Sequence, residues 1–551
     1  MTGTTTQQAL LTNPVIRGFA PDPSMVRVGE WYFVAVSSFE WFPTIPIHRS
    51  RDLFHWEYAG HVESAVQEGS LAGYADSAGI WAPALSVAAG RLWVTYSIVE
   101  SLQKPYFNLS TYITTAAVAE GVLSDWDVPV RVPSHGFDPS LFHHDGRTWL
   151  ANLQNDHRPG GDRFSGIVLT ELERTDGTFR TVGGTKLLLQ RDTLIEGPKL
   201  LFKDGWFYLS LAEGGTGVEH GVLVARSRDV TGPYEIDRQP LLTTRDDPEW
   251  PLQKAGHGEF VQAPDGSWYL VHLVSRPIQT SSGVQSPLGR ETAVQAIVWD
   301  DDGWPRLAQG GWHPAVEVAV PAVPAPERAT TRPATGPARG SAVLDWPWST
   351  LRAPATSEWV DVVDEHSFRL RGRQGIESWR ANSLVGQRLT EHHAVAEVTV
   401  EALPATFAHS AGLVLWYNSS AYISLQLTWA EPEGERQRGQ QFEEGGGGIV
   451  LVLTARSVDG SVELARSAAD AGPWRLRAEL DHGTARFAAG RDGSALEPFG
   501  PEVDASFLSD DFGPLLRFTG TFAAVNAFDL VDETFTATFS RFTLTTSTRR
   551  S

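Results

Sequence analysis

The sequence contains no cysteine, which excludes disulfide bonds and thiolate chemistry. It also has no apolar run of about eighteen residues, so we expect no membrane-spanning helix. The first sixteen residues, MTGTTTQQALLTNPVI, lack the basic and apolar segments of a secretory signal. The lack of a membrane-spanning run predicts a soluble protein, and the lack of a secretory signal predicts a cytoplasmic one.

Positive charge is scarce as well. The chain has 45 lysines and arginines against 66 aspartates and glutamates, a formal net charge of −21. Such a surface repels nucleic acid and anionic lipid, so we expect no nucleic-acid partner and no membrane partner. Neutral or cationic ligands fit this balance, and neutral sugars also fit the 20 tryptophans.

A repeat runs through the first 310 residues. Five segments share one plan: a short head, an apolar stretch, a glycine turn and an aromatic-rich stretch with β character. The segments are DPSMVRVGEWYFVAVSS, APALSVAAGRLWVTYSI, DPSLFHHDGRTWLANLQ, EGPKLLFKDGWFYLSLAE and HGEFVQAPDGSWYLVHLV. Their heads recur every 56 to 61 residues, a spacing that suits one four-stranded propeller blade. The repeat therefore predicts an all-β, five-bladed β-propeller over residues 1–317.

The heads of the five copies are Asp22, Ala82, Asp138, Glu196 and His257. The innermost strands of a propeller surround a central channel, so equivalent heads point toward one place. Three carboxylates and an imidazole would converge there, where a purely structural role would leave like charges repelling. Pro21 and Pro23 on either side of Asp22 hold its backbone in one conformation at the mouth of a strand.

Clustered carboxylates suit two chemistries, the binding of a hard cation such as calcium and acid–base catalysis. No head lies in a D-x-D-x-D-G string, which favours acid–base catalysis. Glycoside hydrolysis needs one carboxylic acid to protonate the leaving oxygen and a second carboxylate on the other face. A third carboxylate near the acid would raise its proton affinity. Phe39 and Trp81 flank the heads and are predicted to line a sugar pocket.

Eight ordered motifs run through the chain: NPVIRGFAPDPS, SSFEWFPTIPIHRSRDL, AGIWAPAL, GFDPSLF, IEGPKL, AEGGT, GHGEFVQ and SPLGRETAVQ. Together they resemble glycoside hydrolase family 43, specifically its two-domain β-xylosidases. The resemblance covers nearly the whole chain, since RLRGRQGIESWRANSLVGQR, HSAGLVLWYN and FTGTFAAVNAFDL near the C-terminus share it.

The resemblance implies three catalytic roles. Asp22 matches the general base that activates water, Asp138 the residue that tunes the pKa of the acid and orients it, and Glu196 the general acid. Implied substrate-binding residues are Phe39, Trp81, His257, Arg290 and Phe522. His257 matches a histidine beneath the site that binds calcium through water in some relatives, while the chemistry itself requires no cofactor.

The implied reaction is that of an inverting, exo-acting β-D-xylosidase that releases xylose from the non-reducing end of short xylo-oligosaccharides. α-L-Arabinofuranosidase activity, alone or in addition, is the alternative, and Ala20 stands beside the base where relatives usually have histidine. Two other hypotheses stay open. One is a non-catalytic sugar-binding propeller, and the other is a retaining fructan-type glycosidase with Asp22 as nucleophile.

The C-terminal part reads as a second domain. Residues 318–342, VAVPAVPAPERATTRPATGPARGSA, are rich in proline and alanine and predict a linker. Beyond it, alternating apolar runs separated by turn residues predict an antiparallel, jelly-roll-like β-sandwich over residues 343–551. The resemblance implies that a loop of this domain carrying Phe522 helps to close the active site, and that the chain could assemble as a homo-oligomer.

Overall fold

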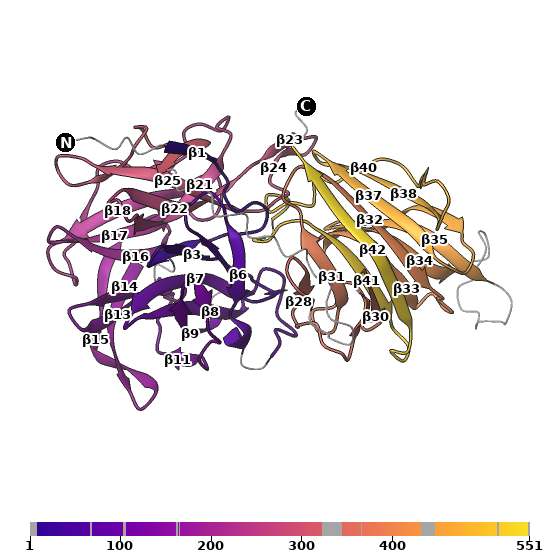
Figure 1. Cartoon of the computed structure of the whole chain (residues 1–551), viewed down its shortest axis with the longest axis horizontal. Helices are drawn as coiled ribbons and strands as arrows, with labels where there is room; N and C mark the ends of the chain where they lie inside the picture. Colours follow the sequence, from indigo (N-terminus) through magenta and orange to yellow (C-terminus); the bar gives the residue numbers. More distant parts are fainter. Residues whose placement is uncertain are drawn as a thin grey trace. The chain divides into compact units, whose positions relative to one another are not determined.

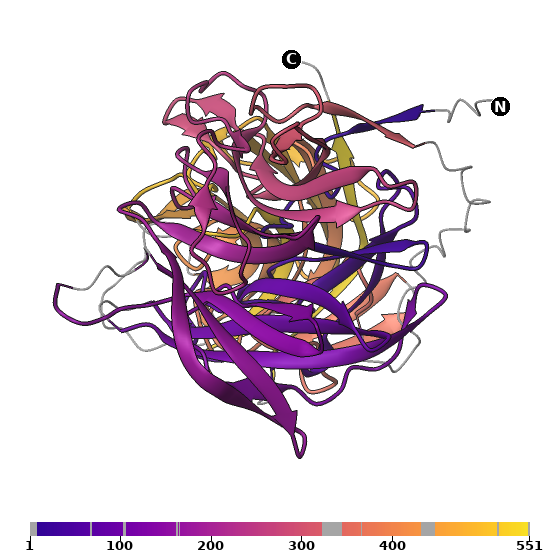
Figure 2. The ribbon, with the colours of Figure 1, turned by 90° about the vertical axis from the view of Figure 1, so that its left-hand side faces the viewer.

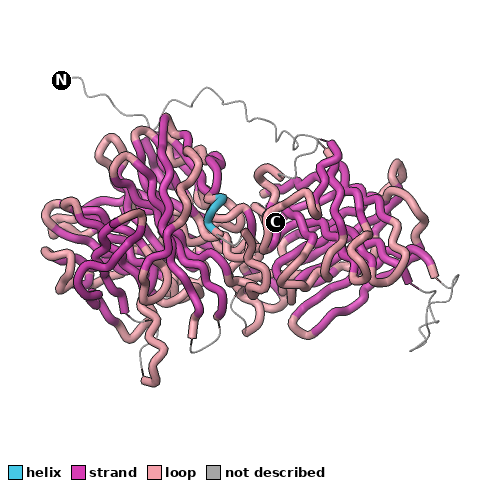
Figure 3. Tube along the Cα trace, turned by 90° about the horizontal axis from the view of Figure 1, so that it is seen from below, coloured by secondary structure: helices cyan, strands magenta, loops and turns pink. Residues whose placement is uncertain are grey.

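The computed structural model describes residues 8–66, 69–102, 106–160, 164, 166–321, 344–364, 366–430, 447–514 and 517–548. Their only helical segment is a single 3-10 turn, Glu63–Ala65, and everything else is strand or loop (Figure 3). Within these ranges no helix has the length and apolar character needed to cross a membrane. The all-β prediction is confirmed.

The repeat forms five antiparallel blades, drawn from indigo through magenta to rose in Figures 1 and 2. The first blade contains β2 (Ser24–Val28), β3 (Trp31–Ala35), β5 (Pro46–Ser50) and β6 (Glu57–His61), with the short β4 (Trp41–Phe42) between β3 and β5 in the chain. The second contains β7 (Gly79–Ala88), β8 (Arg91–Ser101), β9 (Asn108–Ala119), β10 (Val122–Leu123) and β11 (Val130–Val132). The third contains β12 (Ser140–His144), β13 (Arg147–Leu153), β14 (Gly166–Thr175) and β15 (Thr178–Gln190).

The fourth blade contains β16 (Ile195–Lys203), β17 (Trp206–Glu213), β18 (Gly221–Ser227), β19 (Glu235–Ile236) and β20 (Leu242–Thr243). The fifth contains β21 (Gln253–Gln262), β22 (Trp268–Ser275), β25 (Glu291–Trp299) and β26 (Pro305–Leu307). The first strands of the blades contact one another in a closed ring, β2 to β7, β12, β16, β21 and back to β2. This ring surrounds the axis of the predicted five-bladed propeller, which is confirmed.

Apolar clusters join neighbouring blades. Met25 and Val34 of the first blade pack with Val271 and Val294 of the fifth, and all four side chains are buried. Burial of one such side chain stabilises the fold by about 1.5–3 kcal/mol. A strand from each end of the propeller also pairs: β1 (Gln8–Thr12) lies antiparallel to β27 (Glu317–Pro321).

The start of the predicted linker, residues 318–342, is part of a strand in the structure. Residues 318–321 belong to β27, because Val318 and Val320 alternate with outward residues and are buried against the propeller. The rest of the predicted linker, residues 322–342, lies outside the described residues.

The chain divides into two compact units, and the division interrupts the predicted propeller twice. Ser70–Asp76 and Ile278–Gly289 belong to the second unit. The backbone N–H of Leu71 donates to the carbonyl of Arg352 at 2.7 Å, and Leu288 is buried in the core of the second unit. The segment Ile278–Gly289 holds a short hairpin, β23 (Ile278–Thr280) and β24 (Gly283–Gln285). These two segments thus belong to the second compact unit, and the domain bounds 1–317, 318–342 and 343–551 stay a prediction.

The second unit is a sandwich of two antiparallel sheets, coloured orange to yellow in Figure 1. One sheet has the order β36 (Gly460–Ala468), β35 (Gly448–Ser457), β34 (Ala421–Ala430), β33 (His409–Asn418), β41 (Phe522–Asp529), β31 (Ser383–Arg388) and β28 (Ser349–Leu351). The other has the order β29 (Val360–Asp364), β30 (Ser367–Arg371), β42 (Thr536–Ser547), β32 (His393–Ala402), β37 (Trp474–Asp481), β38 (Thr484–Arg491) and β39 (Glu497–Pro498), with β40 (Val503–Asp504) also on β38. Alternate residues of both sheets, such as Leu413, Leu425, Val398 and Phe539, fill one core between them.

Candidate active site

Each blade enters its first strand through the same unusual backbone turn. The φ angle is +53° at Asp22, +29° at Ala82, +52° at Asp138, +58° at Gly197 and +52° at His257. Non-glycine residues seldom adopt positive φ, and such strain gathers at functional sites. Five equivalent turns therefore mark the end of the propeller where the heads lie.

The turn also corrects the register of the fourth copy. Its positive φ falls on Gly197, so Gly197 is the equivalent of the other heads and Glu196 stands one residue earlier. The same earlier position holds Trp81 in the second copy and Phe137 in the third. The site therefore draws on two consecutive positions of the repeat, and the predicted equivalence of Glu196 with Asp22 and Asp138 is wrong by one residue.

Two side chains hold the carboxylate of Asp22. Arg290 Nη1 lies 2.5 Å from Oδ1 and Ser37 Oγ donates to Oδ2 at 2.7 Å. Ser37 in turn accepts a hydrogen bond from the N–H of Ala82 at 2.8 Å, which links the first blade to the second. Asp22, Ser37 and Arg290 are all at most 6% exposed, so this network is shielded from solvent. Charge-assisted bonds of this kind are strong and fix the orientation of the Asp22 carboxylate.

Asp138 and Glu196 lie in a different electrostatic environment. The N–H of Gly197 donates to Asp138 Oδ2 at 3.1 Å. Burial, with repulsion from Asp22, raises the pKa of Asp138 to about 7. Burial and the charges of Asp138 and Asp22 raise the pKa of Glu196 well above its usual range. Glu196 thus holds its proton more tightly than an ordinary carboxyl group and lies close to other carboxylates, an arrangement that suits acid–base catalysis.

Two aromatic residues adjoin these carboxylates. The ring centroid of Phe39 lies 6.2 Å from that of Trp81, and the guanidinium of Arg290 lies 5.7 Å from the Phe39 ring centre. Phe39 has a φ of +48°, and its carbonyl comes so close to Gly79 that a Cβ there would lie 2.2 Å from it. Trp81 Nε1 donates to the carbonyl of Ser77 at 2.9 Å.

Residues 11–305 match the family described as "Glycosyl hydrolases family 43", and residues 340–545 match "Beta xylosidase C-terminal Concanavalin A-like domain". The chain belongs to glycosyl hydrolases family 43. This family 43 hydrolase is 37% identical over 540 residues to "Xylosidase/arabinosidase 43B" of Humicola insolens, with 96% of each chain covered.

Two further relatives cover the whole length. "Xylan 1,3-beta-xylosidase" of Vibrio sp is 36% identical, with 97% of this chain and 98% of the other covered. The solved structure of xylan beta-1,4-xylosidase from Bacillus Halodurans C-125 superposes with a TM-score of 0.88 at 37% identity, covering 97% of this chain and 100% of the other. The family prediction is confirmed, and the chain is a glycoside hydrolase.

Three polar residues of the family 43 hydrolase were missed from the sequence: Ser37 and Lys199, which are buried, and Glu259, which is half-buried. Ser37 holds Asp22, as described above, and Lys199 and Glu259 lie two residues after their heads, Gly197 and His257. An offset of two along an extended strand returns to the same face, so this position could have been found by applying strand periodicity to the heads. Ser37 could not have been found in this way, because its hydrogen bonds link the first blade to the second.

Ala20, two residues before Asp22, is fully buried. Its N–H donates to the carbonyl of Arg290 at 3.0 Å, and its carbonyl accepts from Thr292 Oγ1 at 2.8 Å. Ala20 therefore belongs to the backbone that carries Arg290, and its effect on substrate preference stays a prediction.

Phe522 belongs to the second unit. It begins β41, is fully buried, and lies opposite Trp416 and Arg388 in the neighbouring strands. The other seven predicted site residues lie in the first unit. A contribution of Phe522 to closing the active site stays a prediction.

His257 is buried beside Asp22, with 4.0 Å between its Nδ1 and Asp22 Oδ1. Burial and the nearby charges of Lys199 and Arg290 hold the pKa of His257 well below its ordinary value, so the ring is neutral. The ring packs against Gly197, where a Cβ would come within 2.9 Å of Cε1 and Nε2. A neutral imidazole is a suitable cation ligand, but two positive side chains act on this one.

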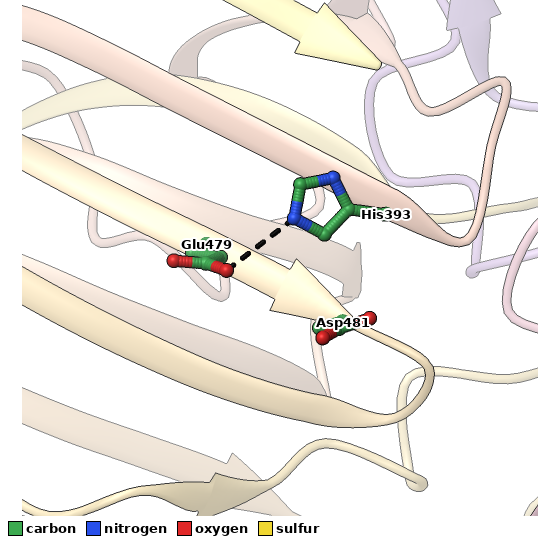
Figure 4. A group of neighbouring side chains, drawn as sticks. All are labelled: His393, Glu479 and Asp481. Atoms are coloured by element: carbon green, nitrogen blue, oxygen red, sulfur yellow. Dashed lines mark hydrogen bonds and ion pairs between the residues drawn. The ribbon is translucent and has the colours of Figure 1, made fainter. Parts of the chain in front are cut away.

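A separate group in the second unit could hold a metal ion. One donor atom from each of His393, Glu479 and Asp481 lies within 4.8 Å of the others (Figure 4). His393 Nε2 lies 3.3 Å from Glu479 Oε1, and its Nδ1 lies 2.9 Å from Ser547 Oγ. Imidazole and carboxylate ligands together suit zinc or manganese. Since it lies in the sandwich, this group is no part of the carboxylate cluster of the propeller.

Proposed function

We propose that this family 43 hydrolase is an inverting, exo-acting β-D-xylosidase that removes xylose from the non-reducing end of short xylo-oligosaccharides. The relatives named as β-xylosidases support this substrate class. The observation that carries the proposed roles is the contrast between an Asp22 held in charged hydrogen bonds and a Glu196 whose pKa lies well above its usual range.

In the proposed mechanism Asp22 is the general base. Its carboxylate, oriented by Arg290 and Ser37, takes a proton from the attacking water. Glu196 is the general acid, and it donates its proton to the glycosidic oxygen as the bond to the anomeric carbon breaks. Asp138 raises the proton affinity of Glu196 through like-charge repulsion. Phe39 and Trp81 are proposed to contact the apolar face of the sugar.

α-L-Arabinofuranosidase activity is a second candidate. "Xylosidase/arabinosidase 43B" of Humicola insolens carries both activities in its name, and "Non-reducing end alpha-L-arabinofuranosidase BoGH43B" of Bacteroides ovatus is 30% identical over 436 residues. Xylopyranosides and arabinofuranosides present similar hydroxyl groups, so one site can accept both. A homo-oligomer and a cytoplasmic location also remain proposals.

Proton NMR of fresh enzyme with xylobiose and an aryl α-L-arabinofuranoside tests these proposals. We expect α-xylose before mutarotation, which a single displacement requires. Initial β-xylose, or a covalent glycosyl-enzyme trapped with a fluorosugar, would instead assign Asp22 as nucleophile in a retaining reaction. Cleavage of the arabinoside alone would keep the roles and change the substrate.

A further inference from the structure

The loop that carries Trp81 has an unusual backbone. Ser77 has a φ of +64° and Gly79 a φ of +93°, and both precede Trp81 in the segment 77–81. A non-glycine residue seldom adopts positive φ, and it stays there only where its surroundings hold it. The contacts of Ser77 should therefore explain why the loop keeps this shape.

Two consecutive residues of the first blade hold this loop at two points. The N–H of Phe39 donates to the carbonyl of Ile80 at 2.9 Å, and the N–H of Ile80 donates to the carbonyl of Phe39 at 3.0 Å. The next residue, Glu40, accepts a hydrogen bond at its Oε2 from the N–H of Ser77 at 3.1 Å. Phe39 and Glu40 together thus fix the loop near both of its ends.

Ser77 connects Glu40 to the indole of Trp81. Its N–H is held by Glu40, and its carbonyl accepts a hydrogen bond from Trp81 Nε1 at 2.9 Å. Trp81 is 8% exposed, and the indole has a single hydrogen-bond donor, so this bond selects one orientation of the buried ring. The hydrogen bonds therefore run from Glu40 through Ser77 to Trp81.

The orientation of the Trp81 ring matters because two other aromatic residues pack against it. Its centroid lies 6.2 Å from that of Phe39 and 5.3 Å from that of Phe137, which directly precedes Asp138. Both contacts are edge-to-face, with interplanar angles of 62° and 83°. Rotation of the indole would break this geometry, so the bond to Ser77 also preserves these aromatic contacts.

The residue type at position 40 supports a positioning role. Glu40 is 1% exposed, and a carboxyl group is costly to bury unless hydrogen bonds compensate it. An apolar side chain of the same size would fill this space at lower cost, but it could not accept a hydrogen bond from Ser77. The bond to Ser77 is thus a contact that requires an acceptor at this position.

We infer that Glu40 is a positioning residue for Trp81, and that through Ser77 it fixes the indole in the orientation in which the ring contacts a sugar. This inference rests on the proposed function, which gives Trp81 its contact with the substrate. It adds a residue that acts through another side chain and does not itself touch the sugar.

The experiment uses variants of the full-length enzyme at two positions. Glu40→Met keeps the approximate size of the side chain and removes the acceptor. Glu40→Asp keeps the carboxyl group but is shorter by one methylene group, and Glu40→Gln keeps both the length and an accepting oxygen. Trp81→Phe keeps an aromatic ring and removes the indole N–H, and it is also combined with Glu40→Met.

Asp52→Ala is the matched control. Asp52 Oδ1 accepts hydrogen bonds from the N–H groups of Phe54 and His55 at 2.9 and 2.7 Å, so this carboxylate also fixes a backbone turn of the first blade. Asp52 follows β5, which is antiparallel to β3, whereas Glu40 follows β3. The two carboxylates therefore lie at opposite ends of the blade.

The parameters kcat and KM are measured with an aryl β-xyloside, or with the arabinoside if only that is cleaved. Glu40→Met and Glu40→Asp should raise KM by roughly two- to tenfold with kcat nearly unchanged, because a misplaced aromatic ring weakens the binding of substrate and transition state alike. Glu40→Gln should stay near the wild type, since its amide oxygen still accepts from Ser77. Asp52→Ala should keep the wild-type KM although its melting temperature falls.

The double variant tests whether the effect runs through Trp81. Glu40→Met should raise KM much less in the Trp81→Phe background than in the wild type, because the bond that Glu40 supports is already lost there. Backbone amide exchange of residues 77–81, measured by mass spectrometry, should be faster in Glu40→Met than in the wild type and in Glu40→Gln. This exchange does not depend on turnover.

Equal effects of Glu40→Met in both backgrounds would overturn the inference, as would a wild-type KM in a folded Glu40→Met. If Glu40→Met does not fold, Glu40→Asp replaces it in every measurement. Unchanged amide exchange over residues 77–81 contradicts the inference whatever the substrate is. A wild type that cleaves neither glycoside contradicts the proposed function instead, so the two failures are distinct.

Discussion

Arg290 Nη1 lies 2.5 Å from Asp22 Oδ1, although the two residues are 268 positions apart in the chain. Arg290 enters β25 in the fifth blade and Asp22 precedes β2 in the first, so this pair joins the blades at which the propeller closes. One contact therefore serves the stability of the ring and the orientation of the proposed base.

Arg290→Gln should impair both the stability of the propeller and the orientation of Asp22. Removing one partner of a buried ion pair leaves an uncompensated charge and costs about 3–5 kcal/mol of folding free energy. We expect a lower melting temperature and a loss of kcat/KM of about 100-fold or more, because Asp22 is no longer oriented. Arg51→Gln is the control: Arg51 pairs with Glu30 on the surface, where such a pair contributes about 1 kcal/mol or less. Equal losses in both variants would contradict the role of Arg290.

Asp138→Asn should raise the stability of the protein at alkaline pH and alter the pH dependence of its activity. The buried Asp138 has its pKa raised to about 7, so the folded protein binds this proton more tightly than the unfolded chain does. Stability is then greatest at low pH and falls as pH rises from about 4 to about 7. Asparagine removes this dependence and can still accept from Gly197, so the variant should melt at a higher temperature than the wild type at pH 8.

The same variant tests the tuning of Glu196. Since the charge of Asp138 helps to raise the pKa of Glu196, its removal should lower that pKa. The alkaline limb of kcat/KM should therefore move to lower pH, while the exposed control Asp204→Asn keeps the wild-type profile. An unmoved alkaline limb would remove Asp138 from this role.

The loss of activity in Glu196→Gln should depend on how much protonation the leaving group of the substrate needs. Glutamine cannot donate a proton to the glycosidic oxygen, so hydrolysis of xylobiose should fall by roughly 10²–10⁴-fold. An aryl glycoside with a strongly acidic phenol needs little protonation and should be cleaved at a rate much closer to that of the wild type. Folding should be little affected, because glutamine has the size of glutamate and brings no charge into this buried position. Equal losses on both substrates would argue against a general acid at this position.

Gly197→Ala should destabilise the protein more than Gly29→Ala. Both glycines have φ near +60°, so alanine is strained at each by about 1 kcal/mol or more. A Cβ at Gly29 meets nothing within 4 Å, whereas at Gly197 it comes within 2.9 Å of the buried His257 ring. The difference in melting temperature between the two variants measures this contact. Equal melting temperatures would show that the ring moves aside at no cost.

Metal binding is expected at the His393 group of the sandwich. Zinc at pH 7.5 should raise the melting temperature of the wild type and of the control His157→Ala, but not of His393→Ala. Turnover should not respond to zinc through this group, since its residues belong to the second unit and the propeller carboxylates to the first. A wild-type melting temperature that zinc does not change would leave the group as a hydrogen-bonded cluster.

Much of the fold could be predicted because the five copies of the repeat can be aligned with one another in the sequence. The glycine turns and aromatic second strands gave five blades, and proline next to Asp22 and Asp138 marked two heads. The fourth copy was misaligned because its carboxylate stands before the turn, and only the φ of Gly197 reveals this. Ser70–Asp76 and Ile278–Gly289 look like ordinary blade loops in sequence. Their membership of the second unit depends on contacts with residues such as Arg352, hundreds of positions away.

The pairing of β1 with β27 has a consequence for the covalent order of the chain. Gln8 lies opposite Pro321 and Thr12 opposite Glu317, so the propeller begins and ends at neighbouring points in space. The five blades therefore form a closed ring, and the first and last strands of the segment that builds it are paired. A circular permutant of the propeller, with residues 8 and 321 joined by a short tether and new ends in a loop between blades, would keep every strand pairing of the native ring.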